Sequence, residues 1–161
     1  MADAARIDTN TSTWTINATM IHAGAANTTL ARLLRSKDVS LATASRRIAE
    51  GLPFRLFTEL CGKLALTQAE LAGHLRISES TLYRRRSTGR FDPSESDRLW
   101  RYLVLYSRAV EVLEHEPDAV EWLRAPLAAL GNSTPLAVSR DGPGATRALA
   151  VLGRIEHGVF G

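Results

Sequence analysis

The chain has 161 residues, of which 45% are apolar, so it can bury a real core and is not disordered throughout. No apolar run approaches the ~20 residues that span a bilayer, and no basic flank leads into an apolar stretch near residue 1. The single cysteine, Cys61, excludes an internal disulfide. We therefore expect a soluble cytoplasmic protein. The four histidines lack metal-ligand spacing, so neither a metal site nor a cofactor is predicted.

Charge is distributed unevenly along the chain. The net charge is only +3, but residues 76–90 hold five arginines and one acid, whereas residues 109–123 hold five acids and no lysine or arginine. Only two of the 20 basic residues are lysines. Arginine suits contacts to phosphates and base edges, although a biased genome composition explains the same excess equally well.

The spacing of apolar residues predicts an all-α fold. Residues 1–27 are rich in Ala, Thr and Asn without a sustained apolar period, so we expect a loose arm there. The next predicted helices cover 28–36 and 40–50, the second closed by Gly51. Pro53 begins another helix, whose apolar stripe includes Cys61. We interpret this cysteine as a buried core residue in preference to a reactive thiol, because no basic residue is adjacent in sequence.

Residues 67–86 carry the signals of a helix-turn-helix. Thr67 and Glu70 fit a capping box at the start of one short helix, and Ser78 fits the cap of a second, after a three-residue break. The apolar Ile77 and Leu82 are placed to pack the two helices together.

The second short helix has the composition of a recognition helix. Small or polar side chains in its first turn are suited to base edges, and the arginines that follow can reach phosphates or guanine. The alternative is a solvated basic face on a helix that only packs. The predicted DNA contacts are Thr67, Gln68, Ser78, Glu79, Ser80, Thr81, Tyr83, Arg84 and Arg85.

Two longer helices are predicted in the second half. Gly89 ends the preceding helix, and Asp92 caps one that runs over about 93–115, with an apolar face wider than a small helix-turn-helix requires. This face predicts packing on the C-terminal part or on a second copy. A last helix covers about 144–157. The apolar Val159 and Phe160 that follow either fold back onto their own domain or contact a partner.

Several segments together carry a family resemblance. Residues 67–86, Gly89-Arg90, 95–99, Trp122-Leu123, 129–136 and the closing stretch 152–160 resemble the Xre/MbcA/ParS antitoxins of bacterial type II toxin–antitoxin pairs, usually encoded beside a RES-domain toxin. The resemblance covers about residues 30–161, and its closing motif is the most specific part. Residues 137–144 depart from the acidic, leucine-rich pattern of the family, which leaves a helix after Pro135 without support.

The resemblance implies a homodimer with two functional parts beyond the arm at 1–27. Residues 28–92 would bind operator DNA of the protein's own promoter, and residues 93–161 would bind the RES toxin, which degrades NAD, by covering its active site. The tail residues implied to contact the toxin are Gly153, Arg154, Ile155, Glu156, His157, Gly158, Val159 and Phe160. The alternative for this tail is simply the packed last helix of the domain.

Two other functions are alternatives to the antitoxin. The first is a stand-alone dimeric repressor, whose operator binding would not depend on a neighbouring gene product. The second is an enzyme that uses His74, His115 or His157 with nearby acids. The sequence has no nucleophile motif, phosphate-binding loop or metal spacing, so we predict that the protein is not an enzyme.

Overall fold

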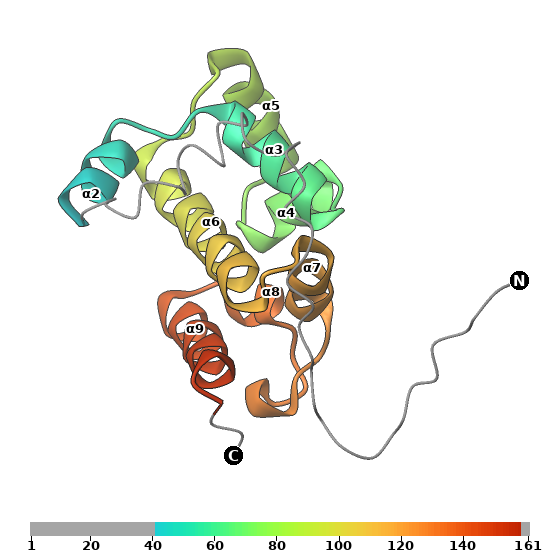
Figure 1. The fold of residues 1–161 in the computed structure, drawn as a ribbon. Coiled ribbons are helices and arrows are strands. Elements are labelled where there is room, and N and C mark those ends of the chain that lie inside the picture. Colours follow the sequence, from blue (N-terminus) through green and yellow to red (C-terminus); the bar gives the residue numbers. More distant parts are fainter. Residues whose placement is uncertain (1–40, 159–161) are drawn as a thin grey trace, which may run out of the picture.

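The computed structural model describes residues 41–158, and these residues form helices without a named strand, as the apolar spacing predicts (Figure 1). The predicted arm, the helix at 28–36, Val159 and Phe160 lie outside the described residues. None of the described helices is long and apolar enough to cross a membrane. The elements are α2 (Leu41–Ala49), α3 (Phe54–Leu64), α4 (Gln68–His74), α5 (Glu79–Thr88), α6 (Pro93–Leu113), α7 (Glu116–Arg124), η1 (Ala128–Leu130), α8 (Pro135–Val138) and α9 (Gly142–Glu156).

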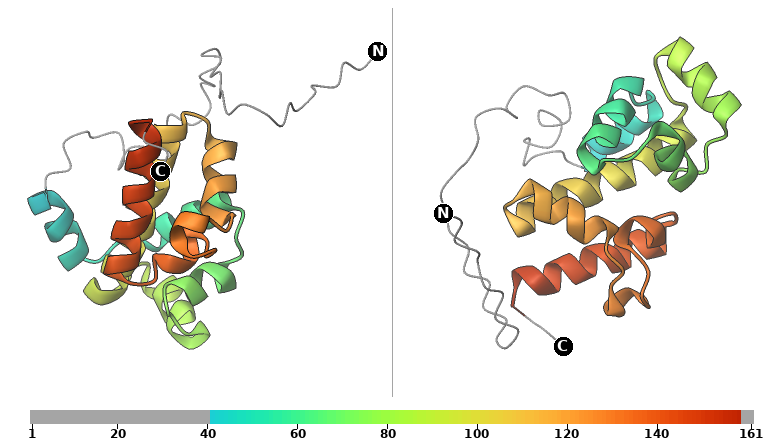
Figure 2. Two further views of the ribbon diagram at one scale, coloured as in Figure 1. Left: turned by 90° about the horizontal axis from the view of Figure 1, so that it is seen from below. Right: turned by 90° about the vertical axis from the view of Figure 1, so that its right-hand side faces the viewer.

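Helix α6 is the central element of the fold. It begins with a capping box, in which the Asp92 carboxylate accepts from the Glu95 amide at 2.8 Å and the Glu95 carboxylate accepts from the Asp92 amide at 3.0 Å. Figure 2 shows α6 running between the helices α3–α5 on one side and α8 and α9 on the other. Its buried face therefore serves both halves of the chain.

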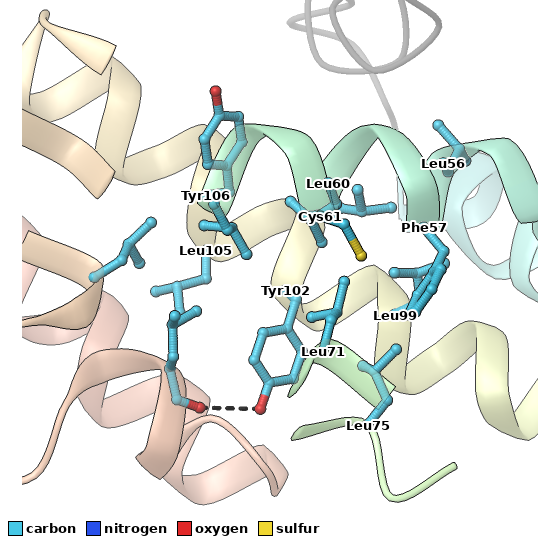
Figure 3. Packing of buried hydrophobic residues seen from close by; sticks show 14 of the residues in the cluster. Leu56, Phe57, Leu60, Cys61, Leu71, Leu75, Leu99, Tyr102, Leu105 and Tyr106 are labelled. Atoms are coloured by element: carbon cyan, nitrogen blue, oxygen red, sulfur yellow. Dashed lines mark hydrogen bonds between the residues drawn. The ribbon is translucent and has the colours of Figure 1, made fainter. Parts of the chain in front are cut away.

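One hydrogen bond joins α6 to the C-terminal half inside the core. The Tyr102 hydroxyl is buried and donates to the Leu136 carbonyl of α8 at 3.0 Å (Figure 3). Burial raises the pKa of this tyrosine to about 12. Cys61 lies in the same cluster, as predicted, and burial raises its thiol pKa to about 11, so it behaves as a core residue.

The segment that departs from the family pattern, residues 137–144, holds the end of one helix, a turn and the start of another. The sequence left a helix after Pro135 without support, but α8 is present there, and Thr134 caps it by accepting from the Ala137 amide at 3.1 Å. The last helix begins at Gly142, two residues earlier than predicted, because Asp141 accepts from the Gly144 amide at 2.7 Å. A Cβ at Gly144 would lie 1.7 Å from the Val138 carbonyl oxygen, so glycine allows α8 and α9 to approach.

Candidate functional site

Helices α4 and α5 form the predicted helix-turn-helix, and both predicted caps are present. The Thr67 hydroxyl accepts from the Glu70 amide at 3.2 Å, while the Glu70 carboxylate accepts from the Thr67 amide at 2.7 Å. The hydrogen bonds that the Glu70 carboxylate accepts from the Thr67 amide and from the Thr67 hydroxyl hold the pKa of Glu70 below its ordinary value. Ser78 caps α5 by accepting from the Thr81 amide at 3.3 Å.

The turn between α4 and α5 fixes the angle of the two helices. Ile77 and Leu82 are buried as predicted, and the Ile77 amide donates to the Ala72 carbonyl at 2.9 Å. Ala72 is itself buried, and its small side chain leaves room for this approach. Arg76 takes the left-handed conformation in the turn, with φ of 53°. The core thus orients α5 while leaving its outer face uncovered.

The outer face of α5 is polar and basic. Glu79, Ser80, Tyr83 and Arg84 are exposed, and Tyr83 is the exposed large apolar residue of the described chain, at 71%. Among the described residues Arg84 has no ion-pair partner. Of the other residues predicted to contact DNA, Thr67 and Ser78 are exposed, whereas Gln68 and Thr81 are half-buried. This surface can offer hydrogen-bonding groups and the unpaired positive charge of Arg84 to a polyanion.

Arg85 differs from the other residues predicted to contact DNA. Its Nε donates to Glu95 at 2.6 Å and its Nη2 donates to Asp92 at 2.7 Å, and the side chain is only 16% exposed. The bonds to Glu95 raise the pKa of Arg85. The sequence predicts a DNA contact at Arg85, and in the structure its guanidinium group joins α5 to Asp92 and Glu95 at the start of α6. Nothing local in the sequence signals this, because the three residues meet only when the loop after Gly89 turns back.

A second arginine contact links the two short helices. The Arg86 Nη2 donates to the Gln68 side-chain oxygen at 2.5 Å, and its guanidinium lies 5.9 Å from the centre of the Phe54 ring. Gln68 is the first residue of α4. Arg86 therefore places its positive charge beside the start of α4.

The end of α9 emerges from the core. Val151 and Leu152 are buried, whereas Arg154, Glu156, His157 and Gly158 are exposed. The remaining tail residues Gly153 and Ile155 are half-buried. The tail thus combines a packed inner side with an exposed polar side.

Arg108 of α6 holds this end of α9. Its guanidinium forms an ion pair with Glu111 at 2.9 Å and donates to Glu156. These two carboxylates raise the pKa of Arg108, chiefly through the hydrogen bond to Glu111. The exposed side of the tail is therefore held at a defined place relative to α6.

Comparison with known proteins assigns both halves. Residues 43–104 match the antitoxin Xre-like helix-turn-helix domain, and residues 108–158 match the antitoxin Xre/MbcA/ParS C-terminal toxin-binding domain. The two matches meet within α6, whereas the division predicted from the sequence lies between residues 92 and 93.

Two curated relatives are similar along much of the chain. The protein "Antitoxin Xre" of Yersinia enterocolitica is 33% identical over 98 residues, which cover 60% of this chain and 66% of that protein. "Antitoxin Xre" of Photorhabdus laumondii is 30% identical over 115 residues, which cover 68% of this chain and 76% of that protein. Because an Xre-like helix-turn-helix domain is followed by a toxin-binding domain, and both relatives are Xre antitoxins, the chain belongs to the Xre family of antitoxins.

Proposed function

We propose that the helix-turn-helix binds operator DNA of the protein's own promoter and represses it. The observation that supports this is the exposed face of α5, where Ser80, Tyr83 and Arg84 project from a helix whose inner side is fixed by the core. Arg85 is left out of the proposed contacts because its charge is already paired. Gln68 and Thr67 at the start of α4 would contact a phosphate.

We propose further that the protein binds DNA as a homodimer. Two copies would present two α5 helices to half-sites about one helical turn apart, which requires a roughly palindromic operator. Trp100 of α6 and Leu149 of α9 pack against the core and are only half-buried, so the exposed part of each would contact the second copy.

Arg84→Ala is expected to weaken binding to the promoter fragment about tenfold, which corresponds to about 1.4 kcal/mol. The lost phosphate contact should also make the salt dependence shallower, by a slope of about 1 in log K against log salt. Fluorescence anisotropy over a range of salt concentrations measures both. Arg147→Ala removes the same charge from the exposed face of α9 and serves as the control. An unchanged slope in the Arg84 variant would contradict the proposed contact.

We propose that the toxin partner is a NAD-degrading RES-domain protein encoded by the adjacent gene, and that the two form a type II pair in the cytoplasm. The support is the match of residues 108–158 to a toxin-binding domain, together with the resemblance of the tail to antitoxins of such pairs. In this proposal the tail covers the toxin active site, so substrate cannot enter.

Cellular NAD content tests the toxin proposal directly. Expression of the adjacent gene alone is expected to lower NAD, and co-expression of this chain is expected to restore it. A normal NAD content with the adjacent gene alone would remove the RES assignment. Operator binding that persists without any effect of the adjacent gene product would then favour a stand-alone repressor.

A further inference from the structure

An open cleft of about 630 Å³ lies between the turn after α4, the first half of α6 and the start of α9. Four arginines line it, namely Arg76 of the turn, Arg98 and Arg101 of α6, and Arg140 before α9. None of its described lining residues belongs to α5. The cleft is therefore a feature separate from the proposed base-reading surface.

The charges in this cleft are not balanced. Its two acids are Asp97, which lies 3.4 Å from Arg101, and Asp141, which already accepts the Gly144 amide at the start of α9. Among the described residues no ion pair involves the three remaining arginines of the cleft, Arg76, Arg98 and Arg140.

One more carboxylate, that of Asp92, interacts with an arginine of this cleft. The charge of Arg98 acts on Asp92 and contributes to the lowered pKa of that carboxyl, chiefly caused by the Glu95 amide. Asp92 is already paired with Arg85 at 2.7 Å, so it does not neutralise Arg98 as well. The cleft keeps an excess of positive charge.

Two donors in the cleft are buried and unused. The Nε atoms of Arg98 and Arg101 are both inaccessible and have no hydrogen-bond partner within residues 41–158. The only hydrogen bond recorded for Arg98 in this part of the chain joins its Nη1 to the Ser94 hydroxyl at 3.3 Å. Buried donors in proteins nearly always have a partner, so these two Nε atoms show that the protein itself leaves part of the hydrogen-bonding capacity of Arg98 and Arg101 unused.

The positive potential of the cleft acts on a neighbouring histidine. His74, the last residue of α4, has its pKa lowered first by burial and then by the charge of Arg140. A neutral ligand would gain nothing from this potential, whereas an anion would be attracted by it.

We propose that this cleft binds phosphate groups. The planar guanidinium group of an arginine can donate two parallel hydrogen bonds to the oxygens of a phosphate. Three arginines of this cleft have no ion pair among the described residues, and their combined charge is more than one carboxylate ligand would neutralise. The N-terminus of the 15-residue helix α9 adds its partial positive charge at the same place. The volume lies within the roughly 300–1,000 Å³ range of small-ligand sites, so it accommodates a diphosphate or larger group. The phosphates come from a soluble ligand or from the DNA backbone beside the operator.

Titration of the full-length chain with inorganic pyrophosphate tests the proposal by calorimetry and by thermal unfolding. We expect saturable binding and a raised Tm relative to sodium chloride of equal ionic strength. The double variant Arg98→Gln/Arg140→Gln is expected to bind at least tenfold more weakly, whereas Arg147→Gln, an exposed arginine of α9 outside the cleft, is expected to bind like the unmodified chain. Circular dichroism in chloride checks that each variant is folded.

Equal binding by the double variant and the unmodified chain, or a response no larger than that to chloride, would overturn the proposal. Anisotropy with the promoter fragment then identifies the source of the phosphate. Weaker DNA binding by the folded double variant assigns the cleft to the DNA backbone, and unchanged DNA binding assigns it to a soluble phosphorylated ligand. Since pyrophosphate binding requires neither operator nor toxin, its failure leaves the antitoxin proposal untouched.

Discussion

Arg85→Ala is expected to lower the free energy of unfolding by about 2 kcal/mol, a change of about 30-fold in the folding equilibrium. The alanine variant leaves the Glu95 side chain, only 6% exposed, without its positive partner. Removing one member of a fully buried pair costs ~3–5 kcal/mol. We expect less here because the Asp92 side chain is 40% exposed and water can replace part of the lost contact.

Urea denaturation measures this loss, with Arg84→Ala as the matched control one position away. The control removes the same kind of side chain from an exposed site, so its stability is expected to change by no more than ~0.5 kcal/mol. The two variants therefore separate a structural arginine from a DNA-contacting one. The assignment of Arg85 would be wrong if its variant kept full stability and instead weakened DNA binding with a shallower salt slope.

Local signals in the sequence were enough to predict the helix-turn-helix. The caps at Thr67 and Ser78 act within three residues, and the packing of Ile77 and Leu82 follows from their spacing. The all-α fold and the buried Cys61 follow in the same way from apolar periodicity. Such features depend on near neighbours, which a single sequence displays.

Features made by distant residues could not be predicted. The hydrogen bond between Arg85 and Glu95 depends on the path of the loop that leads into α6. The hydrogen bond from Tyr102 to the Leu136 carbonyl joins positions 34 apart in sequence. The arginine cleft brings Arg76 and Arg140 together although 64 positions separate them. Charge counts revealed the basic stretch at 76–90, but they could not show which arginines are paired and which are free.

Removal of residues 153–161 is expected to abolish neutralisation of the toxin. These residues carry the closing family motif, and the exposed side chains of Arg154 and His157 follow the buried Val151 and Leu152 in the last turn of α9 and at its C-cap. In cells that co-express the adjacent gene, the truncated chain is expected to leave NAD as low as in cells without any antitoxin.

The truncation also removes packing, so a second variant is needed to assign the loss to binding. Ile155 is half-buried and Glu156 contacts Arg108, and their removal loosens α9. Arg154→Ala/His157→Ala changes only exposed side chains, and its Tm is expected to match that of the unmodified chain. Exposed anchors that become buried at an interface cost ~1–4 kcal/mol when truncated, so calorimetry with the toxin should show binding weakened at least tenfold.

Arg147→Ala is the control for the double variant Arg154→Ala/His157→Ala, because it removes an exposed arginine of the same helix that precedes the tail. Its toxin affinity and its effect on NAD are expected to equal those of the unmodified chain. Full restoration of NAD by the truncated chain would contradict the proposed role of the tail. If the truncation fails while Arg154→Ala/His157→Ala neutralises normally, the exposed polar groups are not the toxin contact. An unchanged Tm of the truncated chain would then assign the loss to the apolar side of the tail, and a lowered Tm would assign it to lost packing.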